Sequence, residues 1–269
     1  MQERPPRAWH VFVTYVIAVA GIVATTGVAI EILRAVYPDM SATTLVRTLP
    51  GLLALSLAAS SGLLLTLVLV VRPLDAARFR LRPGWETGPT LAAMTLGFLA
   101  LGQALDSLTT VLGLADRGAL VLIRQALRGA GGADLFGAVL VLGVGAGAAE
   151  EVFFRGYMQS RLREHWSPAA AVTATAAAFA ALHADVSAVH MVLAFALGLY
   201  LGFVAEISGS TLPAIVCHVI NNIIYTLQTA LGVVVVGREA NLVAVAVGAG
   251  VFLVCVWWVR RTAPGPAPV

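Results

Sequence analysis

The chain has 269 residues, of which 59% are hydrophobic and only 12% charged, and its mean hydropathy is +0.90. Soluble domains carry about 25% charged residues, so this composition excludes a water-exposed surface over most of the chain and indicates a bilayer as its solvent. The net charge of +3 does not indicate nucleic-acid binding. Cys217 and Cys255 both lie inside apolar runs, so neither a disulfide framework nor a cysteine metal site is expected.

Apolar segments of membrane-spanning length follow one another along the chain. A spanning helix needs about 20 mostly apolar residues, and the first segment, from Trp9 to Leu33, is too long for the core of a signal peptide. The sequence therefore predicts an all-α, polytopic membrane protein with about eight transmembrane helices, at residues 9–33, 49–71, 89–112, 134–160, 168–184, 189–207, 211–231 and 240–259. The fifth and sixth segments are short, and a re-entrant pair is the alternative for them.

These segments form three regions: an N-terminal region of three helices (1–133), a motif-bearing core (134–231), and the last helix with a short disordered tail (232–269). The two termini and every second loop, which are expected on one side of the membrane, contain more arginines than the loops on the other side. Positively charged loops are usually cytoplasmic. We therefore expect a multi-pass protein of the inner (plasma) membrane with cytoplasmic termini. Its composition, rich in Ala and Gly and without Lys, suggests a bacterial source. The arginine-rich segment 72–82 reads as a solvated loop, or alternatively as a contact for anionic lipid.

The fourth segment contains ionisable residues, which are costly inside a membrane and by default mark function. Glu151 and Arg155 are four residues apart, with the acid first, which favours an ion pair. Glu150 points about 100° away from Glu151 around the helix. One carboxylate is thus predicted to pair with arginine, while the other faces a cavity as a candidate base. A purely structural Glu–Arg pair is the alternative.

Further polar residues occur in the fifth and seventh segments. His183 ends the motif Phe-Ala-Ala-Leu-His that begins at Phe179, and His218 and Asn222 lie one turn apart on one helix face. Each alone has a simpler explanation, as a packed histidine or as polar contacts between helices. Their expected depths match that of Glu150, so we predict one intramembrane cluster. Acidic residues at segment ends, Asp185 and Glu206, are expected to be solvated.

Small residues four apart occur beside these motifs, at Gly143 and Gly147 and again at Gly198 and Gly202. Such pairs allow close approach of helices. We expect them to pack the core that carries the polar cluster.

The motifs Glu150-Glu151-x-x-x-Arg155, Phe179-x-x-x-His183 and His218-x-x-x-Asn222, in this order, resemble those of the CPBP family. These are the CAAX proteases and bacteriocin-processing enzymes, also called the Abi family, typified by the type II CAAX prenyl endopeptidase. The resemblance covers about residues 134–231. It implies an eight-helix intramembrane peptidase, a hydrolase of the glutamate-activated type. Carried over, Glu150 is the base that activates water with the help of His183, and His218 and Asn222 form the oxyanion hole. Glu151, Arg155 and Phe179 have supporting roles.

The resemblance implies no cofactor, but Glu150, His183 and His218 would be the ligands if a divalent metal took part. The implied partners are the lipid bilayer and a protein or peptide substrate cut near the membrane, in maturation, sorting-signal removal or a bacteriocin-related role. The alternatives are a proton-coupled transporter and a non-proteolytic scaffold or immunity pseudoenzyme.

Overall fold

The protein is described by a computed structural model that covers residues 8–117, 119–184 and 188–264. The described residues form helices and connecting segments, with no strand among them. The helices are α1 (Trp9–Val36), α2 (Ala42–Leu45), α3 (Leu49–Val70), α4 (Gly88–Val111), α5 (Ala119–Leu127), α6 (Gly132–Ala138), η1 (Val139–Ala146), α7 (Gly147–Glu151), η2 (Val152–Gln159), α8 (Ser160–Leu162), α9 (Pro168–Ala181), α10 (Val189–Ser208), α11 (Leu212–Leu231) and α12 (Arg238–Thr262).

Seven helical runs in the described part are long and apolar enough to cross a membrane, and the predicted all-α, polytopic fold is confirmed. One of them, Gly132–Leu162, is a continuous run of α6, η1, α7, η2 and α8. We call it the glutamate helix. The predicted fifth span is α9, which ends at Ala181 and has only 14 residues. Asp185 lies outside the described residues.

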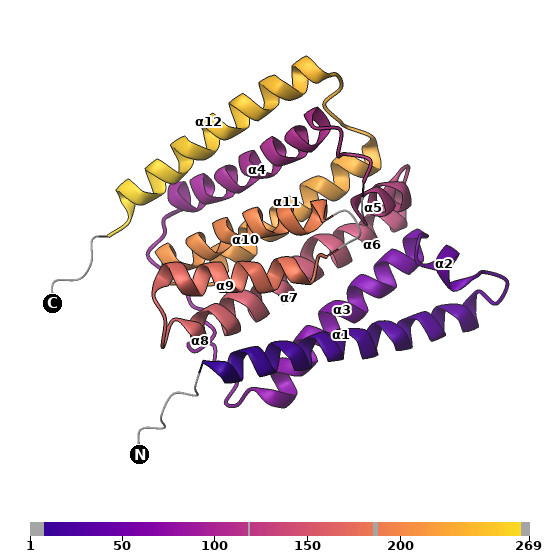
Figure 1. The fold of residues 1–269 in the computed structure, drawn as a ribbon, viewed down its shortest axis with the longest axis horizontal. Helices are drawn as coiled ribbons and strands as arrows, with labels where there is room; N and C mark the ends of the chain where they lie inside the picture. Colours follow the sequence, from indigo (N-terminus) through magenta and orange to yellow (C-terminus); the bar gives the residue numbers. More distant parts are fainter. Residues whose placement is uncertain (1–7, 118, 185–187, 265–269) are drawn as a thin grey trace.

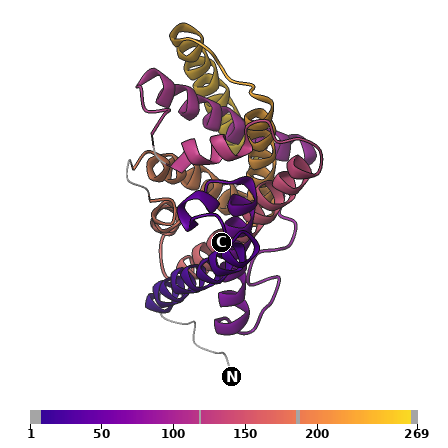
Figure 2. The ribbon, with the colours of Figure 1, turned by 90° about the vertical axis from the view of Figure 1, so that its right-hand side faces the viewer.

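The helices form three layers (Figure 1). One outer layer is the pair α1 and α3, the other is the pair α4 and α12, and the glutamate helix lies with α9, α10 and α11 between them. In the view turned by 90°, α1 and α12 again lie on opposite sides (Figure 2). The most apolar window of α10 is 44% buried, against 11% in α1. Of the seven runs, α10 in the middle layer is therefore the most buried, while α1 in an outer layer offers most of its apolar surface to lipid.

Proline and hydroxyl residues mark where several helices begin. Proline lies in the first turn of α3, α4, α9 and α11. Backbone N–H groups in the first turn have no acceptor within the helix, so proline, which lacks this group, is tolerated there. The side chains of Thr48 and Ser167 also accept hydrogen bonds from backbone N–H groups of α3 and α9. Gly209 and Gly232 end α10 and α11 with positive φ angles of 69° and 67°, a conformation that glycine adopts without strain.

The glutamate helix departs from regular α geometry. Its η1 and η2 segments are π-helical, and the five-residue α7 between them ends with Glu150 and Glu151. Widened π turns occur mostly as short segments and often at functional sites. The carboxylates thus lie on a short regular turn between two wide ones.

Most of the segment 72–82 is exposed, as predicted for a solvated loop, but Phe79 docks it on the core. Phe79 is only 6% exposed, and its ring centroid lies 6.4 Å from that of Tyr157 on η2. The hydroxyl of Thr211 donates to the carbonyl of Phe79 at 2.8 Å, and the indole N–H of Trp85 donates to Ile207 at 2.6 Å. One apolar residue among the arginines therefore anchors the segment to the turn between α10 and α11.

Candidate active site

Glu151 is the buried centre of the polar cluster. Its side chain is fully buried, and its Oε1 accepts from Arg155 Nη1 at 2.6 Å and from His218 Nδ1 at 2.7 Å. The ion pair predicted from the four-residue spacing is therefore present. A carboxylate paired with arginine is ionised and only accepts hydrogen bonds, so the Nδ1 of His218 is the donor.

Glu150 lies on the other side of the same histidine. Its Oε2 is 3.7 Å from His218 Nε2, and its side chain is 22% exposed, against 0% for Glu151. The imidazole of His218 thus lies between two adjacent carboxylates, hydrogen-bonded to Glu151 and 3.7 Å from Glu150, and we call this arrangement the His218 bridge. The sequence predicted a different environment for each carboxylate, but not this bridge.

Arg155 has further partners on two other helices. Its Nη2 donates to the carbonyl of Gly198 on α10 at 2.8 Å, and its guanidinium lies 5.0 Å from the ring centroid of Phe179 on α9. The Phe179 ring also meets the His218 ring edge-on at 6.0 Å. Phe179 therefore contacts both Arg155 and His218, so α9 packs directly against the cluster.

His183 reaches the cluster through Phe179. Its Nδ1 donates to the carbonyl of Phe179 at 2.9 Å, and the two ring centroids are 4.6 Å apart. The ring centroid of His183 also lies 4.8 Å from that of His190. Because Nδ1 carries the hydrogen, Nε2 of the neutral imidazole is an acceptor. The structure brings His183 beside the cluster, with Phe179 as the shared neighbour.

Asn222 lies one turn after His218 on α11 and faces the glutamate helix. Its Nδ2 donates to the carbonyl of Leu142 on η1 at 3.2 Å. A Cβ atom on Gly147 would lie 3.5 Å from this nitrogen, and one on Gly143 would lie 2.7 Å from Ile223. The small residues at 143 and 147 therefore let α11 approach closely, as predicted.

Among the residues that the structure describes, no three His, Cys, Asp or Glu side chains are grouped as ligands of a metal ion, so the alternative set of Glu150, His183 and His218 is not gathered. Cys217 and Cys255 are buried and form no disulfide.

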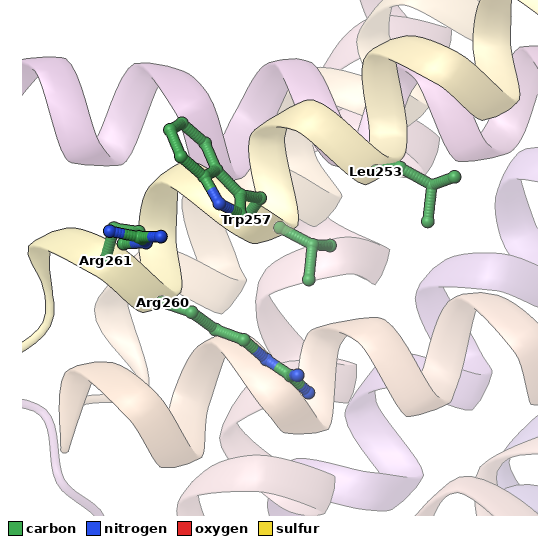
Figure 3. Close-up of a pocket in the computed structure, with 5 residues that line it drawn as sticks. Leu253, Trp257, Arg260 and Arg261 are labelled. Carbon is green, nitrogen blue, oxygen red and sulfur yellow. The ribbon is translucent and has the colours of Figure 1, made fainter.

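A groove of about 370 Å³ near the end of α12 is separate from the cluster (Figure 3). Its lining contains neither a carboxylate nor a histidine: Leu253, Val256, Trp257, Arg260 and Arg261.

Two polar contacts differ from expectation. Gln159 is fully buried, and its Nε2 donates to the carbonyl of Gly202 at 3.0 Å. No sequence motif marks Gln159, although it lies eight residues after Glu151 on the same helix. Glu206, predicted to be solvated, accepts from Arg163 at 2.7 Å and from Arg80 at 3.4 Å. The carboxylate oxygens of Glu206 are therefore bound by arginines from two other segments.

Comparison with known proteins gives one match. Residues 132–224 match the family model of the type II CAAX prenyl endopeptidase, Rce1-like. No curated protein and no solved structure matches the chain. The matched segment contains all three motifs and the cluster built above, which confirms the resemblance seen in the sequence. The segment from Gly132 to Ile224 is therefore similar to the Rce1-like type II CAAX prenyl endopeptidases.

Proposed function

We propose that the protein is an intramembrane endopeptidase that hydrolyses a peptide bond near the membrane by a glutamate-activated water. The observation that carries this proposal is the His218 bridge between two neighbouring glutamates with unequal environments. The arginine-paired Glu151 is closed off from solvent. Glu150 is partly exposed and lies 3.7 Å from His218 Nε2, which suits a carboxylate that accepts a proton from water.

In the proposed reaction, Glu150 takes a proton from a water molecule whose oxygen attacks the carbonyl carbon of the scissile bond. The electron pair of the C=O bond moves to oxygen and gives a tetrahedral oxyanion. When the C–N bond breaks, Glu150 returns the proton to the leaving nitrogen. Donors fixed beside the oxyanion stabilise this charge most in a site with little water.

His218 and Asn222 are the proposed oxyanion donors. Because Nδ1 of His218 donates to Glu151, its Nε2 carries a hydrogen only in the imidazolium form. The Glu151 carboxylate stabilises that positive charge and fixes the ring, as the buried carboxylate does in serine-protease triads. Asn222 would exchange its bond with Leu142 for one to substrate.

His183 is the proposed assistant of Glu150. Its bond to the Phe179 carbonyl leaves Nε2 as an acceptor that can orient the attacking water. This role requires water or substrate between His183 and Glu150. We propose a reaction without a cofactor.

The proposed substrate is a protein or peptide with a cleavage site near the membrane. The family name points to prenylated CAAX proteins, while maturation of peptides, removal of sorting signals and bacteriocin-related processing are the bacterial options. The first residues of α1 and the last of α12 lie at the same end of the bundle (Figure 1). We assign this end to the cytoplasmic face of the inner membrane, because loop arginines are concentrated there.

The test is processing by cells that carry the wild type or Glu150→Gln. The substitution keeps the shape of the side chain and removes the base, so cleavage should fall by about 10²–10⁴-fold. Proteomics of new protein N-termini and C-termini would identify shared uncut precursors. The matched control is Glu31→Gln, because Glu31 pairs with Arg34 on the exposed side of α1.

Equal processing by wild type and Glu150→Gln, with both proteins folded in the membrane, would contradict the peptidase. A transporter or scaffold would then be the better assignment. Loss of processing in the Glu31→Gln control as well would show that the assay reports expression and not catalysis.

A further inference from the structure

A regular series of hydrogen bonds joins the glutamate helix and the residues after it to α10. Arg155 donates to the Gly198 carbonyl at 2.8 Å, Gln159 to the Gly202 carbonyl at 3.0 Å, and Arg163 to the Glu206 carboxylate at 2.7 Å. Partners in each pair are 43 residues apart, and successive pairs are one helical turn apart. We call this row, which starts at Glu151, the polar seam.

The seam contains buried polar atoms without a partner among the described residues. These atoms are Glu151 Oε2, Arg155 Nε, Gln159 Oε1 and, on the facing helix α9, Thr175 Oγ1. Their residues are between 0% and 1% exposed. Among the described residues, Glu86 Oε2 is also buried without a partner, but it lies outside the seam.

The geometry places Thr175 opposite Gln159. α9 follows the glutamate helix after a short connection and runs antiparallel to it (Figure 1). Phe179 contacts Arg155, and one turn along both helices from this contact lie Thr175 and Gln159. A Cβ atom on Gly202 would lie 3.1 Å from Gln159 Oε1 and 2.8 Å from Val172 Cγ1, so α9, α10 and the glutamate helix meet at this level.

Such atoms require partners. A buried donor or acceptor left without a hydrogen bond costs about 1–3 kcal/mol, and lipid tails offer none. The four atoms are of mixed kind: Arg155 Nε donates, the Glu151 and Gln159 oxygens accept, and the Thr175 hydroxyl does both. Water is the small ligand that both donates and accepts, and buried waters typically make about three hydrogen bonds in such polar surroundings.

We propose that the polar seam binds internal water at two levels. The first site lies at Glu151 Oε2 and Arg155 Nε. The second lies between Gln159 Oε1 and Thr175 Oγ1. About 12 Å of helix rise separates Glu151 from Gln159, so one molecule cannot serve both levels.

The two waters would have different consequences. The first completes the hydrogen bonding of the ion pair that holds His218. The second connects the glutamate helix to α9, the helix that carries Phe179 and leads to His183. This inference does not depend on peptidase activity, because it concerns how the charged cluster is satisfied inside the membrane.

The direct experiment is a structure of the full chain in lipid at a resolution that shows ordered water. We expect solvent density within about 2.7–3.2 Å of Gln159 and Thr175 together, and a second density beside Glu151 and Arg155. A direct Thr175–Gln159 hydrogen bond, together with a two-bond Arg155–Glu151 pair, would overturn the proposal.

A substitution gives an independent test through the sign of its effect. Thr175→Val keeps the shape of the side chain and removes the hydroxyl. If the hydroxyl binds water, the melting temperature should fall by ~2–4 °C, and Thr175→Ser should restore part of the loss. If the hydroxyl is orphaned, its removal should raise the melting temperature, and this result would overturn the second water site.

Discussion

The glutamate helix and α12 are two long apolar helices with opposite surroundings. Their most apolar windows have similar buried shares, 22% and 17%. In the glutamate helix, however, every residue of Phe153–Gln159 is buried. In α12 the buried residues form a narrow stripe: Asn241, Gly248, Cys255 and Val259. A helix that is buried all round belongs to the core. Hydropathy predicts that both helices span the membrane. Only the contacts between helices show which of the two has a buried environment for polar groups.

The arginines of the two helices show the same contrast. Arg155 is 1% exposed and bonded to Glu151 and Gly198. Arg260 lies in the last turn of α12 (Figure 3). Its guanidinium is 5.5 Å from the centroid of the Phe203 ring. The first must be matched by protein groups, whereas the second can extend toward the membrane surface.

The largest expected effect on stability is therefore that of Arg155→Met. It leaves a buried carboxylate without its cation, which costs about 3–5 kcal/mol. Arg260→Met, the matched control, removes an exposed cation–π contact worth about 0.5–1 kcal/mol. Unfolding of both variants in the same lipid or detergent measures the difference, and equal losses would contradict the contrast between the helices.

Glycine substitutions in the two regions should change the free energy of unfolding by an intermediate amount. A Cβ on Gly202 would lie 2.8 Å from Val172, whereas one on Gly250 of α12 would meet nothing within 4 Å. Gly202→Ala should therefore lower the free energy of unfolding by about 1–3 kcal/mol. Gly250→Ala should raise it by roughly 0.5–1 kcal/mol, because glycine is costly inside a helix. Thermal unfolding of the two variants gives opposite shifts if the packing is as described.

The smallest effect is expected at the end of the seam. Glu206 is 22% exposed and pairs with Arg163 and Arg80, and partly exposed ion pairs contribute about 0–1 kcal/mol. Glu206→Gln should therefore lower stability slightly, and added salt should reduce the difference from wild type. The control is Glu239→Gln in the first turn of α12. A loss as large as that of Arg155→Met would show that the seam is closed to solvent along its whole length.

Much of the fold could be predicted from the sequence because it depends on local composition. The predicted first segment, 9–33, corresponds to α1 (Trp9–Val36), and the last, 240–259, to α12 (Arg238–Thr262). The Glu151–Arg155 pair was also predictable, since four residues fix the distance along a helix.

What could not be predicted depends on contacts between helices. No spacing within a helix shows that His218 lies between Glu150 and Glu151, because His218 is 67 positions after Glu151. The buried Gln159 was overlooked because a single glutamine in an apolar run has no recognised motif. Phe79 was hidden among arginines, where charge dominated the interpretation. The roles of Glu150, His183 and Asn222 in catalysis remain predictions.

The π-helical segments on either side of α7 have a consequence for alignment. Each wide turn takes up more residues than an α turn, so the angular phase of the helix is reset before and after the glutamates. Gly143 and Gly147 face α11, while Arg155 and Gln159 face α10. A helical wheel for 139–159 must therefore include these wider turns to give the direction of each side chain.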